Sequence, residues 1–126
     1  MLERKPFPDI EAALVELLSD LATCGTVTPP NLDSSLPFIR IMRYGGNDDL
    51  INDSARIDID AFGQDRASSY ELGEAIRQRL LAFPFSLTNC VIDKVTSNTG
   101  PMEIPWGDAN VRRRNASYTV ICRRPL

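Results

Sequence analysis

The sequence predicts a single α+β domain over residues 1–126, whose elements follow the order α-β-β-α-β-β. We expect a mixed or antiparallel four-stranded sheet with two helices packed on one face. Two patterns support this fold class. Residues 56–62 alternate polar and apolar side chains, as a half-buried strand does. After Gly63, apolar residues recur at three- or four-residue steps as far as Phe83, which is the spacing of one helical face.

The first helix is expected over residues 9–23. Asp9 and Glu11 complement the positive end of the helix dipole, and Gly25 is a natural C-terminal stop. The prolines within residues 26–36 then predict an extended loop. The apolar face of this helix consists of Ile10, Leu14, Leu17, Leu18 and Leu21.

The first two strands, over residues 38–44 and 56–62, are expected to pair as neighbours. Residues 45–54 between them contain two glycines and several Asn and Asp residues, which predict a turn-rich loop. On the polar side of the pair, Arg40 would face Asp58 or Asp60. The side chains expected to be buried are those of Ile39, Ile41, Ile57 and Ile59.

The second half of the chain contains the remaining helix and strands. Asp65 can cap the second helix, which would end near Phe83 because Pro84 cannot continue it. The β-branched residues in the segment 90–96 predict a third strand. A long loop is expected over residues 97–110 and a fourth strand over residues 115–123.

The composition argues against several classes of protein. The chain has no histidine, which removes the commonest general base and the commonest transition-metal ligand. Its net charge of −3 is unlike the basic footprint of a nucleic-acid binder. No apolar run reaches the ~20 residues that cross a bilayer. The three cysteines suit free thiols better than a disulfide framework. We therefore expect a cytoplasmic protein with no catalytic activity, no cofactor and no membrane partner.

Asp58 and Asp60 form the sharpest enzymatic candidate. Two carboxylates two residues apart on a strand project the same way and could share a magnesium ion. A nuclease-like cluster could be completed by Glu71, Glu74 or Glu103. The favoured interpretation is a polar strand side, solvated or at an interface, balanced by Arg40 and Arg56.

Two other segments invite a functional interpretation. Arg112, Arg113 and Arg114, with Arg123 and Arg124, could contact phosphates, but in an acidic chain we favour contacts with protein carboxylates. Trp106 stands in a proline-stiffened loop, where it could anchor a partner or fold back onto the core. Gly45-Gly46 lacks a phosphate-loop context, and the nearby aspartates lack the spacing of a calcium-binding loop.

A series of short segments in a fixed order also resembles one protein family. The series consists of Phe7-Pro8-Asp9 before a helix, Arg43-Tyr44-Gly45-Gly46 with Asp48-Asp49, Arg56-Ile57-Asp58-Ile59-Asp60 with Asp65-Arg66-Ala67, Ile92-Asp93 with Gly100-Pro101, and Pro105-Trp106 through Asn110-Val111-Arg112-Arg113. In order and spacing the chain resembles the tail terminator proteins of long-tailed, non-contractile phages, over nearly its whole length.

The resemblance implies a small subunit without catalytic residues that forms a hexameric ring. Such a ring caps the tail tube, stops its polymerisation and presents a surface to the head-side connector. The implied partners are further copies of the chain, the tail tube protein and the connector, with DNA only as cargo passing through the lumen. The implied location is the virion tail, assembled in the host cytoplasm.

We expect the subunit or tube interface to use an acidic and a basic set of side chains, because a cyclic ring joins two different patches of one subunit. The candidates are Asp48, Asp49, Asp58, Asp60, Trp106, Arg112, Arg113 and Arg114. Arg113→Glu is expected to weaken assembly and leave the fold intact. The alternatives are a head–tail stopper or adaptor, and a magnesium-dependent nuclease that uses Asp58 and Asp60.

Overall fold

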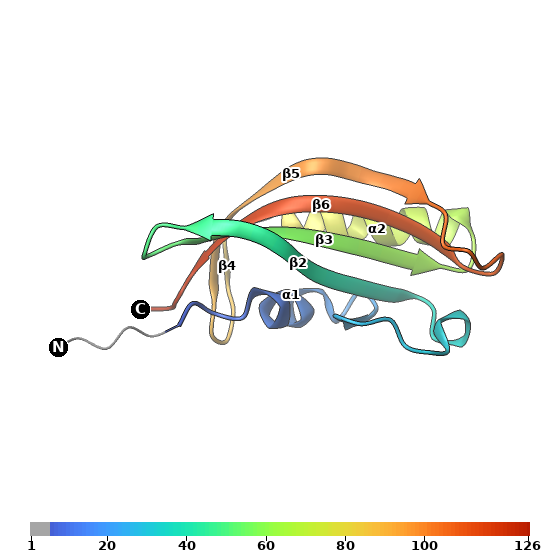
Figure 1. Ribbon diagram of the computed structural model, residues 1–126, viewed down its shortest axis with the longest axis horizontal. Helices are drawn as coiled ribbons and strands as arrows, with labels where there is room; N and C mark the ends of the chain where they lie inside the picture. Colours follow the sequence, from blue (N-terminus) through green and yellow to red (C-terminus); the bar gives the residue numbers. More distant parts are fainter. Residues whose placement is uncertain (1–5) are drawn as a thin grey trace.

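A six-stranded sheet forms the body of the computed structural model, which describes residues 6–126 (Figure 1). The strand order is β1-β2-β3-β6-β5-β4, with β1 parallel to β2 and all other pairs antiparallel. The strands are β1 (Thr23–Gly25), β2 (Phe38–Asp48), β3 (Asp53–Gly63), β4 (Phe85–Ser86), β5 (Val91–Ile104) and β6 (Arg112–Arg123). The α+β class is confirmed, but the prediction of four strands is wrong. Residues 1–5 of the predicted domain lie outside the described residues.

The two unpredicted strands are short edge strands. β1 begins at Thr23, the predicted last residue of the first helix, and reaches the predicted stop at Gly25; its three residues pair with Phe38–Arg40 of β2. β4 lies in the expected connector and pairs two residues with the start of β5. Runs of two or three residues are too short to show a periodic pattern, so the sequence did not predict these strands. They form because the edge of a neighbouring strand offers backbone hydrogen-bond partners.

Helix α1 (Ile10–Leu18) is accordingly shorter than predicted. Asp9 caps it as expected, accepting a hydrogen bond from the backbone N–H of Ala12 at 3.1 Å. At the other end, Arg79 donates to the Leu17 carbonyl and to the Asp20 carboxylate, both at 2.8 Å. This arginine satisfies a carbonyl that the helix leaves open, so the end of α1 is fixed by a tertiary contact.

Both predicted loops within the hairpins are largely strand. β2 and β3 pair as far as Asp48 and Asp53, which leaves a four-residue turn. Gly45 and Gly46 follow a bulge in β2 and have φ angles of +142° and +124°. A Cβ on Gly46 would lie 2.0 Å from the Ser54 carbonyl oxygen, so this position requires glycine. β5 likewise continues to Ile104 across three register shifts.

The main core lies between the sheet and both helices. Helix α2 (Arg66–Leu80) begins with the predicted Asp65 cap, which forms a reciprocal capping box with Ser68. Its buried face joins that of α1 in one cluster with the sheet. The predicted burial of Ile39, Ile41, Ile57 and Ile59 is confirmed. Among residues 6–126, neither helix has the length and apolar character of a bilayer span.

A second, smaller core covers one end of the opposite sheet face. Phe38 and Phe62 are register partners whose neighbours Ile39 and Ala61 belong to the main core, so the phenylalanines point the other way. They pack with Leu32 of the 3₁₀ helix η1 (Leu32–Ser34) and with Val111. Part of the face that was expected to be polar is therefore covered by apolar side chains.

Tyr118 of β6 supplies a test of the main core. Its side chain is fully buried, and its hydroxyl has no hydrogen-bond partner among the described residues. Burial raises the pKa of Tyr118 from 10 to about 12, so the folded state keeps the proton that the unfolded chain releases. Stability should therefore fall as the pH rises from 10 to about 12.

We expect Tyr118→Phe to gain roughly 1 kcal/mol in free energy of unfolding at pH 7, because it removes an unsatisfied hydroxyl. The variant should also lose less stability than the parent between pH 10 and pH 12. Urea unfolding at pH 7 and between pH 10 and pH 12 measures both effects, and the control is Tyr70→Phe at an exposed position. A variant that is less stable than the parent at pH 7 would contradict the assignment.

Candidate functional site

Two distinct surfaces lie at opposite ends of the long axis of the molecule (Figure 1). The first is the hairpin tip, residues 48–53, where β2 turns into β3. The second is the β5–β6 pocket, formed where β5 turns into β6. The two β-hairpins point in opposite directions along the sheet, so the two surfaces face away from each other (Figure 1).

The hairpin tip is internally hydrogen-bonded. The Asp49 carboxylate accepts hydrogen bonds from the backbone N–H groups of Ile51 (3.1 Å) and Asn52 (2.7 Å), and these bonds lower the pKa of Asp49. Leu50 has a φ of +81°, a left-handed conformation that is rare for a bulky residue. Leu50 and Ile51 are 62% and 68% exposed. The turn therefore holds two apolar side chains out in solvent.

An ion pair fixes the base of the hairpin tip. Arg43 donates from both terminal nitrogens to the buried carboxylate of Asp53, at 2.5 and 2.8 Å. Its Nε also donates to the Gly45 carbonyl at 3.0 Å, across the bulge. Because this bidentate pair ties both strands together, the tip is held in one orientation.

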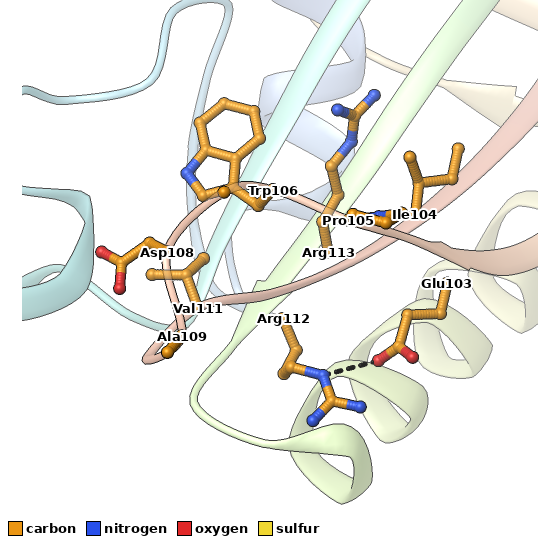
Figure 2. Close-up of a pocket in the computed structure, with 10 residues that line it drawn as sticks. Glu103, Ile104, Pro105, Trp106, Asp108, Ala109, Val111, Arg112 and Arg113 are labelled. Atoms are coloured by element: carbon orange, nitrogen blue, oxygen red, sulfur yellow. Dashed lines mark hydrogen bonds and ion pairs between the residues drawn. The ribbon is translucent and has the colours of Figure 1, made fainter.

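The β5–β6 pocket has an apolar wall and a charged rim (Figure 2). Its volume is about 550 Å³. The apolar wall comes from Ile104, Pro105, Trp106, Ala109 and Val111. At the rim, Arg112 donates from Nε to the Glu103 carboxylate at 2.7 Å, and this bond lowers the pKa of Glu103. Arg112 and Arg113 point to opposite sides of β6 (Figure 2).

A buried carboxylate anchors the pocket to the sheet. Asp60 is 1% exposed and accepts hydrogen bonds from Arg40 (2.5 and 3.0 Å), Arg113 (2.9 Å) and Asn115 (2.8 Å). Both guanidinium groups also lie against the Trp106 ring, at 5.8 and 5.5 Å from its centroid. Asp60 thus orients two arginines that hold the pocket wall in place.

The same network occupies the proposed metal site. The predicted pairing of Arg40 with Asp60 is confirmed, but the interpretation of Asp60 as a solvated residue is wrong. Its carboxylate oxygens already accept from cationic groups, where a metal ion would have to sit. Asp58 accepts from Asn115 at 3.1 Å. Within residues 6–126, no group of three or more His, Cys, Asp or Glu side chains is placed to hold a metal ion.

Three of the seven charged interface candidates form ion pairs within the described part of the chain. Arg113 pairs with Asp60, and Arg112 pairs with Glu103. The expectation that Arg113→Glu leaves the fold intact is therefore withdrawn, because Arg113 binds a buried carboxylate. Arg114 lies beneath α2 with its guanidinium 5.3 Å from the Tyr70 ring centroid. The exposed candidates are Asp48 and Asp49 at one end of the molecule and Arg112 at the other.

Trp106 folds back onto the second core, one of the two alternatives considered for it. Its ring meets Phe62 edge-on, with centroids 4.8 Å apart and planes at 72°. Leu50 and Ile51 were not predicted as surface groups, although two adjacent aliphatic residues inside an Asp- and Asn-rich turn were a visible signal. The pocket was not predicted either, because the residues that hold Trp106 in place, Phe62 and Arg40, are distant from it in the sequence.

Comparison with known proteins places the chain in a family. Among solved structures, a chain of the virion of a native gene transfer agent particle has the same fold, with a TM-score of 0.66. That match covers 90% of this chain and 94% of the other, at 14% sequence identity. A comparison with curated proteins finds no significant match. Residues 6–125 match the family described as phage tail termination protein. Because this match spans nearly all of the chain, the protein belongs to the phage tail termination protein family.

Proposed function

We propose that this structural tail protein caps the tail tube as a closed ring and stops tube polymerisation. Membership of the phage tail termination family over residues 6–125 carries the proposal. The mechanism would be geometric. A ring that docks on the last tube layer offers the next tube subunit no surface like that of the tube, and no bond is made or broken.

The proposed partners are further copies of the chain, the tail tube protein and a head-side connector. We take the ring to be a hexamer on the long, non-contractile tail of a phage. The tail is assembled in the host cytoplasm, and DNA passes through the lumen of the ring. Two unlike surfaces at opposite ends of the subunit support a ring, because cyclic symmetry joins different patches of neighbouring copies. The Asp58–Asp60 nuclease is not proposed, since arginines already hold Asp60.

Particles made without this protein test the proposal. We expect tails of abnormal and variable length in electron micrographs, and normal lengths when the parent gene is supplied in trans. Full heads beside detached tails of normal length would instead identify a head–tail stopper or adaptor. Infectious particles with attached tails of normal length would show that the protein has neither role.

A further inference from the structure

We infer that the hairpin tip of one copy inserts into the β5–β6 pocket of the next copy in the ring. Leu50 and Ile51 would fill the pocket against its Trp106 side, while Asp48 and Asp49 would face Arg112 at the rim. This inference rests on the proposed ring and assigns the two surfaces that close it.

The hairpin tip has the features of a binding anchor. Its two aliphatic side chains remain more than half exposed, so folding of the single chain buries little of their apolar surface. The Asp49 hydrogen bonds and the Arg43–Asp53 pair hold them in one orientation before any partner arrives. A preorganised anchor loses less conformational entropy on binding, which favours affinity.

The β5–β6 pocket matches this anchor in size and in polarity. A volume of about 550 Å³ is within the range of sites that hold compact apolar groups. Its wall is aromatic and aliphatic, and Phe62, Arg40 and Arg113 support Trp106 from behind. A cavity with an apolar wall and a supported tryptophan suits the insertion of Leu and Ile side chains.

The rim of the pocket has charges of both signs, Arg112 together with Glu103 and Asp108, whereas the hairpin tip is acidic. Within residues 6–126, neither Asp48 nor Asp49 forms an ion pair, so the hairpin tip carries two uncompensated carboxylates. Arg112 binds Glu103 through Nε, which leaves its two terminal nitrogens without a hydrogen bond to another described residue. These terminal nitrogens would donate to an incoming carboxylate of Asp48 or Asp49, which would fix the orientation of the hairpin tip.

The placement of the two surfaces excludes closure within one chain. Each lies at one end of the long axis, so a tip can reach only the pocket of another molecule (Figure 1). The contact is head-to-tail, because the tip and the pocket are different patches. A head-to-tail contact gives a ring when its rotation closes, and a closed ring leaves no unpaired tip.

Two single substitutions test the contact from its two sides. Ile51→Asp removes the apolar anchor, and Ala109→Trp fills the pocket from an exposed position on its wall. Val27→Asp is the matched control, because Val27 is 76% exposed and lies on neither surface. All three positions are exposed, so circular dichroism and melting temperature should stay close to those of the parent.

Self-association is measured by sedimentation velocity, and by chemical cross-linking of copies bound to purified tail tubes. We expect Ile51→Asp and Ala109→Trp each to weaken self-association roughly tenfold to a hundredfold, with Val27→Asp unchanged. A mixture of the first two variants retains one intact tip and one intact pocket per pair. It should therefore give dimers and no rings.

The outcomes separate this inference from the proposed function. If Ile51→Asp forms parent-like rings, the inference is wrong, and failure of those rings to bind tubes would assign the hairpin tip to the tube instead. If the parent neither self-associates nor binds tubes, the proposed function is wrong as well. Loss of rings in both variants, with dimers restored by mixing, would establish the tip-in-pocket contact.

Discussion

Asp60→Ala is expected to lower the free energy of unfolding by about 3–5 kcal/mol, because it leaves two arginines without the carboxylate they share. The Asp60 side chain is buried, and the side chains of Arg40 and Arg113 are mostly buried beside it. Removing one member of such a group leaves uncompensated charge in a place that water hardly reaches. The loss is larger than for an exposed ion pair, which contributes about 0–1 kcal/mol.

Chemical denaturation of Asp60→Ala and Asp58→Ala measures the difference. Asp58 is the matched control, because it lies on the same side of β3, is less buried and accepts one hydrogen bond, from Asn115. We expect Asp58→Ala to lower the free energy of unfolding by about 1 kcal/mol. Equal losses in the two variants would contradict the structural role assigned to Asp60. The Arg112–Glu103 pair at the rim of the pocket should stay intact in both.

Phe62→Ala is expected to lower the free energy of unfolding by about 3–5 kcal/mol, the usual range when a buried aromatic ring is removed from a packed core. Phe62 is fully buried, meets the Trp106 ring edge-on and packs with Phe38 and Val111. Its removal would leave a cavity behind the wall of the β5–β6 pocket. The variant should therefore lose both stability and the shape of the pocket.

Trp106 is the only tryptophan in the chain, so its fluorescence reports the second core directly. We expect a red-shifted native spectrum in Phe62→Ala, together with a lower denaturation midpoint. Met42→Ala is the control, since Met42 lies on the same sheet face and is 40% exposed, and its cost should be within about 0.5 kcal/mol. An unchanged midpoint in Phe62→Ala would show that the second core adds nothing to stability.

Local patterns predicted the helix starts and the faces of the central strands. Asp9 and Asp65 cap their helices as expected, because capping depends on a side chain and a backbone N–H three residues away. The isoleucines of β2 and β3 point into the main core, because strand alternation is a local property. These features need no knowledge of distant residues.

Features that depend on distant residues were predicted poorly. β1 exists because the edge of β2 lies beside it, and no pattern in residues 23–25 signals this. β5 continues through Gly100-Pro101 because bulges absorb the residues that do not fit the ladder. The sequence showed which face of β3 is polar, but the burial of Asp60 depends on arginines 20 and 53 residues away.

The functional surfaces were predicted in part. The acidic hairpin and the arginine segment were identified from composition, and the structure places Asp48, Asp49 and Arg112 where another molecule can reach them. It places Asp60 and Arg113 in a pair within the chain. The family suggested by the resemblance is confirmed over residues 6–125, whereas the ring, its contacts and its partners remain proposals.

Elongation of purified tail tube protein in vitro shows whether this chain terminates a tail. The protein is added to growing tubes at a concentration near that of the tube ends, and tube lengths are followed by electron microscopy. We predict that growth stops at one end of each tube and that a ring of this protein is visible there. Tubes that continue to grow at the original rate, with no ring at either end, would contradict the proposed function.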